Sequence, residues 1–151
     1  MAPFHITAIG DTVLDAIRMK TVHVAEMIAE RGRDGRVEAP DGTFSVALSS
    51  SEKDGAITPE HLFAGAYAAC FLESLKNHAE KTHHSVNGFT VVGRAHLNED
   101  ERGEYRLQVD LRAALPGLSP SQAEHLMHLA HQTCPYSRAT RGNVTVNLSF
   151  D

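Results

Sequence analysis

The amino-acid sequence predicts an α+β domain that combines an antiparallel sheet with two helices. Residues 105–112 alternate apolar and polar side chains, which is typical of a strand with one face in water. Two other segments, opening at Thr58 and at Ser119, start with a capping residue followed by proline, and this pattern marks the start of a helix. Strands before, between and after these helices indicate an α+β arrangement.

The predicted elements follow the order strand, strand, strand, helix, strand, strand, helix, strand. A short segment around Val37 lies between turn residues at 32–35 and 41–42 and forms the second of these strands. The remaining strands are predicted at 22–29, 44–48, 89–97, 105–115 and 144–150.

The first helix begins at Thr58, with Pro59 at the first helical position and Glu60 near the positive end of the helix dipole. Its middle is apolar on almost every side, so we expect it to lie at the centre of the protein. Small residues within 64–69 allow another backbone to approach closely, and the helix becomes polar from Glu73 onward.

The second helix opens with a capping box formed by Ser119 and Gln122. Its apolar residues recur at intervals of three and four, so that Cys134 falls on the buried stripe at the helix end. Pro135 disfavours a helical conformation for the residue before it, which ends the helix there.

Length and composition indicate one soluble domain. The 151 residues are 42% hydrophobic and 22% charged, and a net charge of -5 argues against broad nucleic-acid binding. No segment resembles a secretory signal or a membrane span, so we expect a cytoplasmic protein without a membrane partner. The clear pattern starts near residue 19, which predicts a single domain at 19–151 and an N-terminal extension at 1–18.

Two cysteines offer redox chemistry. Cys70 lies in the apolar middle of the first helix, where burial would raise the pKa of its thiol and leave it inert. A reactive thiolate there needs a cation beside it, and arginine suits this position because it stays charged when partly desolvated. The competing interpretation is that Cys70 and Cys134 are small buried hydrophobes.

Two long motifs resemble those of the organic hydroperoxide resistance proteins, which belong to the OsmC superfamily. The first reads TPEHLFA at 58–64 and AACF at 68–71, and the second reads AHQTCPYS at 130–137 and ATRGN at 139–143. The turn GRDG at 32–35 resembles the arginine-bearing turn of that family. The resemblance extends from about Val22 to Phe150.

The resemblance implies an OsmC-like fold with antiparallel sheets around two long central helices, assembled as an intertwined homodimer. It also implies a thiol peroxidase without a cofactor, in which Cys70 attacks the peroxide and becomes a sulfenic acid. Arg33 and Glu60 would hold that cysteine ready, and Cys134 would form a disulfide with it. Dihydrolipoyl groups on lipoylated proteins would then reduce the disulfide.

Helix geometry adds a prediction about the subunits. Glu60 and Cys70 are ten residues apart, which places them about 15 Å apart along one straight helix. If Glu60 acts at a cysteine, we expect it to serve Cys70 of a second subunit, with two such helices crossing about a two-fold axis.

Several assignments stay open from the sequence alone. Arg31 and Arg36 compete with Arg33 for the role of active-site arginine, and the charged stretch at 49–57 leaves the preferred hydroperoxide open. Histidines recur every third residue on the second helix, yet without a metal-binding pattern, so we expect no metal site. Four aromatic residues are candidates to line a substrate pocket, although core packing is the commoner role: Phe63, Tyr67, Phe71 and Tyr136.

We therefore hypothesise a cysteine-based peroxidase that reduces alkyl or fatty-acid hydroperoxides to alcohols and is recycled by a dithiol. The alternative is a non-catalytic protein of the same fold that binds a small hydrophobic ligand at the dimer crevice. The sequence leaves open the physiological reductant and the role of residues 1–18.

Overall fold

The computed structural model describes residues 20–50 and 55–151, which form two sheets and three α-helices. The strands and the two long helices follow the predicted order, and a short third helix is added before the last strand. The predicted extension at 1–18 lies outside the described residues. The elements are β1 Ile28–Glu30, the 3-10 turn η2 Gly32–Asp34, β2 Arg36–Glu38, β3 Ser45–Ala47, α1 Pro59–Lys81, β4 Thr90–Glu99, β5 Tyr105–Ala114, α2 Pro120–Thr133, α3 Pro135–Thr140 and β6 Thr145–Phe150.

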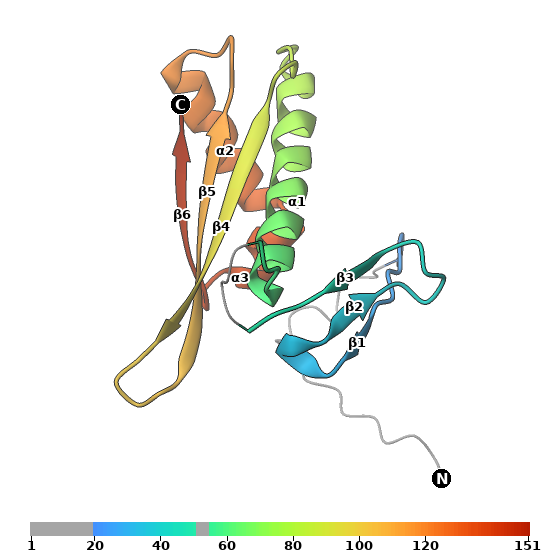
Figure 1. Ribbon diagram of the computed structural model, residues 1–151. Coiled ribbons are helices and arrows are strands. Elements are labelled where there is room, and N and C mark those ends of the chain that lie inside the picture. The colour runs from blue at the N-terminus through green and yellow to red at the C-terminus, as the bar shows by residue number, and fades with distance from the viewer. Residues whose placement is uncertain (1–19, 51–54) are drawn as a thin grey trace.

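The larger sheet has the strand order β4-β5-β6, and α1 and α2 cover one of its faces (Figure 1). Strands β4 and β5 form an antiparallel hairpin, as predicted, but β6 pairs with β5 in parallel, from Gln108↔Thr145 to Ala113↔Phe150. The prediction of purely antiparallel sheets was therefore wrong for β6. Helices α2 and α3 carry the chain back along the sheet after β5, so that β6 starts at the same end as β5.

The core lies between the larger sheet and the helices. It contains Tyr67, Phe71 and Leu75 of α1, whose side chains are fully buried against β5 and α2 residues such as Leu111 and Leu126. Gly93 of β4 lies where α1 crosses the sheet: a Cβ at Gly93 would stand 2.6 Å from the backbone oxygen of Ala64. The predicted central position of the first helix is confirmed on this side.

The opposite face of α1 is uncovered in the single chain. Gly65, Ala66 and Ala69 are exposed there, in the middle of an otherwise apolar helix. Among the described residues, a Cβ at Gly65 would meet no atom outside its own helix within 4 Å. Small exposed residues in the apolar segment of this 23-residue helix are unusual for a surface that faces only water.

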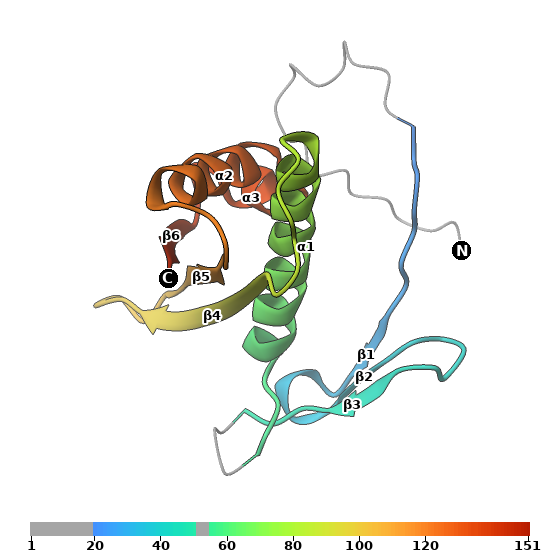
Figure 2. The ribbon, with the colours of Figure 1, turned by 90° about the horizontal axis from the view of Figure 1, so that it is seen from above.

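The smaller sheet, β1-β2-β3, stands apart from this core (Figure 1). Its strand β1 exposes the apolar side chain of Ile28 to solvent. The strand predicted at 22–29 is confirmed only at Ile28 and Ala29, because residues 20–27 have no neighbouring strand within the described chain. Figure 2 shows this segment running extended and clear of α1. Val22 and Val24 are 90% and 77% exposed, so these alternating apolar side chains do not pack against the described part of the chain.

Both predicted helix starts are confirmed. The Ser119 hydroxyl accepts the N–H of Gln122 at 3.3 Å, and the Gln122 side chain accepts the N–H of Ser119 at 2.8 Å. Helix α2 ends before Cys134, whose backbone is extended (φ -58, ψ 125), and α3 then starts at Pro135. This third helix was not anticipated from the sequence. Within the described residues, no helix is both long and apolar enough to span a bilayer.

Candidate active site

The two cysteine sulfurs face each other across the contact between α1 and α3. Cys70 lies in the middle of α1, Cys134 stands at the junction of α2 and α3, and both are free thiols. The Cys134 thiol points at the Cys70 Sγ atom, with 3.5 Å between the two sulfurs. A disulfide has an S–S length of about 2.05 Å, so a side-chain adjustment of about 1.5 Å would join them.

Exposure distinguishes the two thiols. Cys134 is fully buried, whereas Cys70 keeps some contact with solvent. Cys70 lines a groove of about 510 Å³ along the C-terminal half of α1. The other lining residues are Glu73, Ser74, Asn77, His78, Lys81, Thr133 and Pro135. Only Cys70 is thus open to a reagent from outside.

Burial raises the pKa of the Cys70 thiol, the backbone N–H of Tyr136 lowers it, and the neighbouring Cys134 raises it again. Among the described residues of a single chain, no arginine contributes to this balance. The described residues of one subunit therefore favour the thiol form of Cys70 at neutral pH, and a reactive thiolate there would need a cation from outside them.

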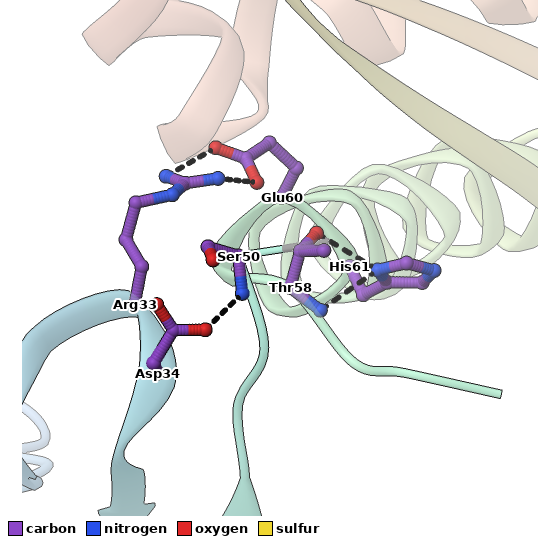
Figure 3. A network of polar contacts seen from close by, with 6 residues as sticks. All are labelled: Arg33, Asp34, Ser50, Thr58, Glu60 and His61. Carbon is purple, nitrogen blue, oxygen red and sulfur yellow. Dashed lines mark hydrogen bonds and ion pairs between the residues drawn. The ribbon is translucent and has the colours of Figure 1, made fainter. Parts of the chain in front are cut away.

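Arg33 and Glu60 form a two-pronged ion pair at the start of α1 (Figure 3). Arg33 extends from the η2 turn, and its Nη1 and Nη2 atoms donate to the two Glu60 carboxylate oxygens at 2.9 and 2.6 Å. The Glu60 side chain is 15% exposed and the Arg33 side chain 44% exposed. The Arg33 side chain holds the pKa of Glu60 below its usual range, so the pair is charged on both sides at neutral pH.

The η2 turn and the start of α1 are held by further polar contacts in the same view. Asp34 accepts the backbone N–H of Ser50 at 2.7 Å, which ties the turn to the connection between β3 and α1. At the helix start, the backbone N–H of Thr58 donates to Nδ1 of His61 at 3.1 Å. A histidine thus takes the part that Glu or Gln usually plays in a capping box, which sequence patterns did not indicate.

Of the three arginines left open by the sequence, Arg33 is the one bound to Glu60. Arg36 instead donates to the Ser45 hydroxyl at 2.7 Å, and Arg31 is exposed, with a left-handed backbone at φ 57. The pair lies at the opposite end of the α1 apolar segment from Cys70, as the spacing of ten residues requires.

Two of the four aromatic residues predicted to line a pocket belong to the core. Tyr67 and Phe71 are 0% exposed, so neither presents surface to a ligand in the single chain. Phe63 is half-buried beside Tyr67, and Tyr136 is 39% exposed next to the cysteines. These last two remain candidates for contact with a substrate.

A buried polar chain beside the sulfurs was missed in the sequence. The Tyr67 hydroxyl donates to Ser137 Oγ at 2.9 Å, and Ser137 Oγ stands 3.1 Å from Nδ1 of His131. Thr140 Oγ1 lies 3.1 Å from the Tyr67 hydroxyl oxygen. The available signal was the helical spacing of Cys134, Ser137 and Thr140, which only becomes visible once α3 is known.

The described residues contain no group of three or more His, Cys, Asp or Glu side chains placed to hold a metal ion. The histidines on α2 point to different surroundings, since His131 contacts Ser137 while His128 is exposed.

Comparison with known proteins gives consistent matches. The family model of OsmC-like proteins matches residues 51–149. An organic hydroperoxide resistance protein from Xanthomonas axonopodis pv. citri is 34% identical over 136 residues, covering 87% of this chain and 96% of that protein. Organic hydroperoxide resistance protein OhrB from Bacillus subtilis is 36% identical over 131 residues, covering 83% of this chain and 96% of that protein.

Solved structures agree with these relatives. The crystal structure of an organic hydroperoxide resistance protein from Legionella pneumophila superposes with a TM-score of 0.81 at 35% identity, covering 87% of this chain and 99% of that one. A related structure from Vibrio cholerae, with captopril bound in one of its active sites, gives a TM-score of 0.81 at 33% identity, covering 89% of this chain and 95% of that one. The chain therefore belongs to the OsmC-like family, and within it to the organic hydroperoxide resistance proteins.

Proposed function

We propose that this protein reduces organic hydroperoxides to alcohols with Cys70 as the nucleophile and Cys134 as the resolving thiol. The observation that carries the proposal is the 3.5 Å separation of two free sulfurs, one open to a groove and one fully buried. The relatives named for organic hydroperoxide resistance support this substrate class. Phe63 and Tyr136 offer apolar contacts to an alkyl or fatty-acid chain.

In the first step, the Cys70 thiolate attacks the outer peroxide oxygen, the O–O bond breaks, and the alkoxide takes up a proton to leave as an alcohol. Cys70 is then a sulfenic acid. In the second step, the Cys134 sulfur attacks the Cys70 sulfur, the S–O bond breaks, and the Cys134 proton leaves with the hydroxyl as water. A dithiol, such as a dihydrolipoyl group on a lipoylated protein, reduces the disulfide by attacking Cys70, the sulfur that is open to the groove.

We also propose that the active site is completed by a second copy of the chain. Two α1 helices that cross antiparallel and place Glu60 of one copy beside Cys70 of the other would be closest at Gly65, midway between these positions. Gly65, Ala66 and Ala69 are the small, uncovered residues that such a crossing needs. The crossing would bring the Arg33–Glu60 pair to the partner's Cys70 and supply the missing cation.

Arg33 in that position would do two things. Its charge would lower the pKa of the Cys70 thiol against the effect of burial, and its N–H groups would stabilise the charge that develops on the departing alkoxide. Glu60 would hold the guanidinium fork in one orientation through the two-pronged pair.

Intact mass after one equivalent of cumene hydroperoxide tests the proposal. The wild-type chain should lose two hydrogens and gain no oxygen, because a disulfide forms. Cys134→Ser should gain one oxygen and turn over once, and Cys70→Ser should leave the peroxide unreacted. Peroxide consumption by Cys70→Ser at the wild-type rate would refute the assignment. An unchanged wild-type mass would favour the rival hypothesis, a protein that only binds a small hydrophobic ligand.

A further inference from the structure

The hydroxyl chain next to the cysteines occupies a defined place between the two helices. Tyr67 precedes Cys70 by three residues on α1, and Ser137 follows Cys134 by three residues on α3. The Tyr67–Ser137 hydrogen bond and the Cys70–Cys134 contact are therefore two parallel links between the same helices, about 4.5 Å apart along α1. The two sulfurs must approach each other by about 1.5 Å to form a bond. The Tyr67–Ser137 hydrogen bond therefore helps to fix the position of α3 relative to α1 during that approach.

We propose that Tyr67, Ser137 and His131 are positioning residues for the disulfide-forming step, in that their hydrogen-bonded chain holds α3 against α1 with the Cys134 sulfur aimed at Cys70. The inference rests on the proposed function, since it concerns the second of its two steps. It adds three residues that make no contact with the peroxide.

The burial of the chain supports a specific orientation of its protons. Tyr67 and Ser137 are 0% exposed, so their hydroxyls depend on one another for partners. The Ser137 Oγ atom accepts the hydrogen bond from the Tyr67 hydroxyl. The Ser137 hydroxyl therefore donates to Nδ1 of His131, and a neutral imidazole can accept this hydrogen bond. Thr140 donates to backbone carbonyls at 3.0 and 3.2 Å, which leaves its oxygen lone pairs toward Tyr67.

A protonated His131 reverses this order. Its Nδ1 would then donate to Ser137, Ser137 would turn its proton to Tyr67, and Tyr67 would donate to Thr140. Burial, the Arg141 guanidinium and the His128 imidazole each lower the pKa of His131. Because the docked arrangement binds the proton more weakly than a free imidazole would, acid weakens the docking of α3 as pH falls from the ordinary histidine range toward the lowered pKa.

The groups that face His131 come from more than one segment. Arg141, after α3, donates from Nη2 to the backbone oxygen of His131 at 2.8 Å, and His128 lies one turn earlier on α2. A positive charge on His131 would meet these two groups in addition to the hydroxyl of Ser137. The disulfide-forming step should therefore slow in acid by a part that depends on His131, apart from any effect of acid on the attacking Cys134 sulfur.

The test follows both steps in one experiment. The protein is mixed with one equivalent of cumene hydroperoxide and quenched at intervals, and intact mass separates the sulfenic acid, with one added oxygen, from the disulfide, with two hydrogens lost. Tyr67→Phe keeps the ring in the core but removes the hydroxyl. We expect it to form the sulfenic acid at the wild-type rate and to form the disulfide about fivefold more slowly, the equivalent of one hydrogen bond of average strength.

Variants at His131 and its neighbour provide the matched comparison. Asparagine places an acceptor that does not titrate where Nδ1 stands, so His131→Asn should keep a near wild-type disulfide rate at pH 7 and slow less in acid than the wild type does. His131→Leu should form the disulfide slowly both at pH 7 and in acid. His128→Gln, at an exposed position without a bond to Ser137, should keep the rate at pH 7 but show less acid slowing, because one of the groups that lower the pKa of His131 is then absent.

Equal disulfide rates for Tyr67→Phe and wild type would overturn the inference, and so would an equal slowing of both steps, which would indicate general loosening of the core. A wild-type protein that forms no sulfenic acid and no disulfide overturns the proposed function itself. These outcomes are distinguishable because each step has its own mass change.

Discussion

Replacing Gly65 with leucine distinguishes a monomeric protein from the proposed dimer, because the change should raise the stability of a monomer and lower that of the dimer. Among the described residues of a single chain, a Cβ at this position has no neighbour outside its own helix within 4 Å, and leucine favours a helix over glycine by about 0.8 kcal/mol. A monomer should therefore become slightly more stable.

In the crossed-helix dimer the same change has the opposite result. Two leucines would meet near the two-fold axis, where the helices are closest, and overpacking typically costs about 1–3 kcal/mol for each. The two subunits together would lose roughly 2–6 kcal/mol, which raises the dissociation constant at least about thirtyfold. Gly65→Ala should have a weaker effect in the same direction.

Sedimentation equilibrium gives the mass and the dissociation constant, and urea unfolding at two protein concentrations gives the stability, which depends on concentration for a dimer. Glu80→Leu, at an exposed position near the end of α1, is the control and should leave the mass unchanged. A wild-type monomer, or a Gly65→Leu protein that is more stable and keeps its dimeric mass, would refute the crossing at Gly65.

Three further outcomes are expected. Gly93→Ala should lower the free energy of unfolding by about 1–3 kcal/mol in urea titration, because the new methyl group meets the Ala64 backbone oxygen at 2.6 Å; an unchanged midpoint would contradict the close crossing of α1 and β4. Ser119→Ala should cost about 1 kcal/mol by the same measurement, while Ser121→Ala, two residues later, should cost much less. The Glu60 carboxyl, followed by carbon NMR, should titrate below the ordinary glutamate range because its folded pKa is lowered. The Arg33–Glu60 pair is then intact above that range and lost as pH falls through the lowered pKa, and Arg33→Gln should raise the Glu60 pKa.

Much of the fold was predictable because its signals are local. Proline after a capping residue marked both long helices, and strict alternation marked β5, since each depends on the backbone of a few neighbouring residues. The parallel placement of β6 was not predictable in this way. It depends on the path by which α2 and α3 return the chain to the sheet. Helix α3 was not predicted because it starts at Pro135, the residue that signals the end of α2.

The segment at 22–29 shows a different limit. Its alternation of valines describes a strand, but a strand also needs an edge to pair with, and the described chain offers none. An alternating pattern therefore does not by itself give a strand in a single chain. Gly65 and Ala66 likewise are exposed in the described chain, and a close contact for them belongs to the helix crossing that we propose.

The candidate site divides along similar lines. Cys70, Cys134, Arg33 and Glu60 were selected by motif, and the structure pairs them as two cysteines and one ion pair. Tyr67 was assigned to a pocket because its aromatic ring suits an apolar ligand, yet its hydroxyl serves a buried chain to Ser137. Such a role depends on residues 70 positions away, which no local pattern connects.

The pKa of the Cys70 thiol is the most direct test of the whole account. It can be measured from the pH dependence of iodoacetamide alkylation in Cys134→Ser protein at concentrations where the assembly is intact. We expect a value below the ordinary thiol range of about 8.5 and a marked rise in Arg33→Ala, because the partner's guanidinium is then absent. A thiol that titrates above that range in both proteins, as burial alone dictates, would contradict the account.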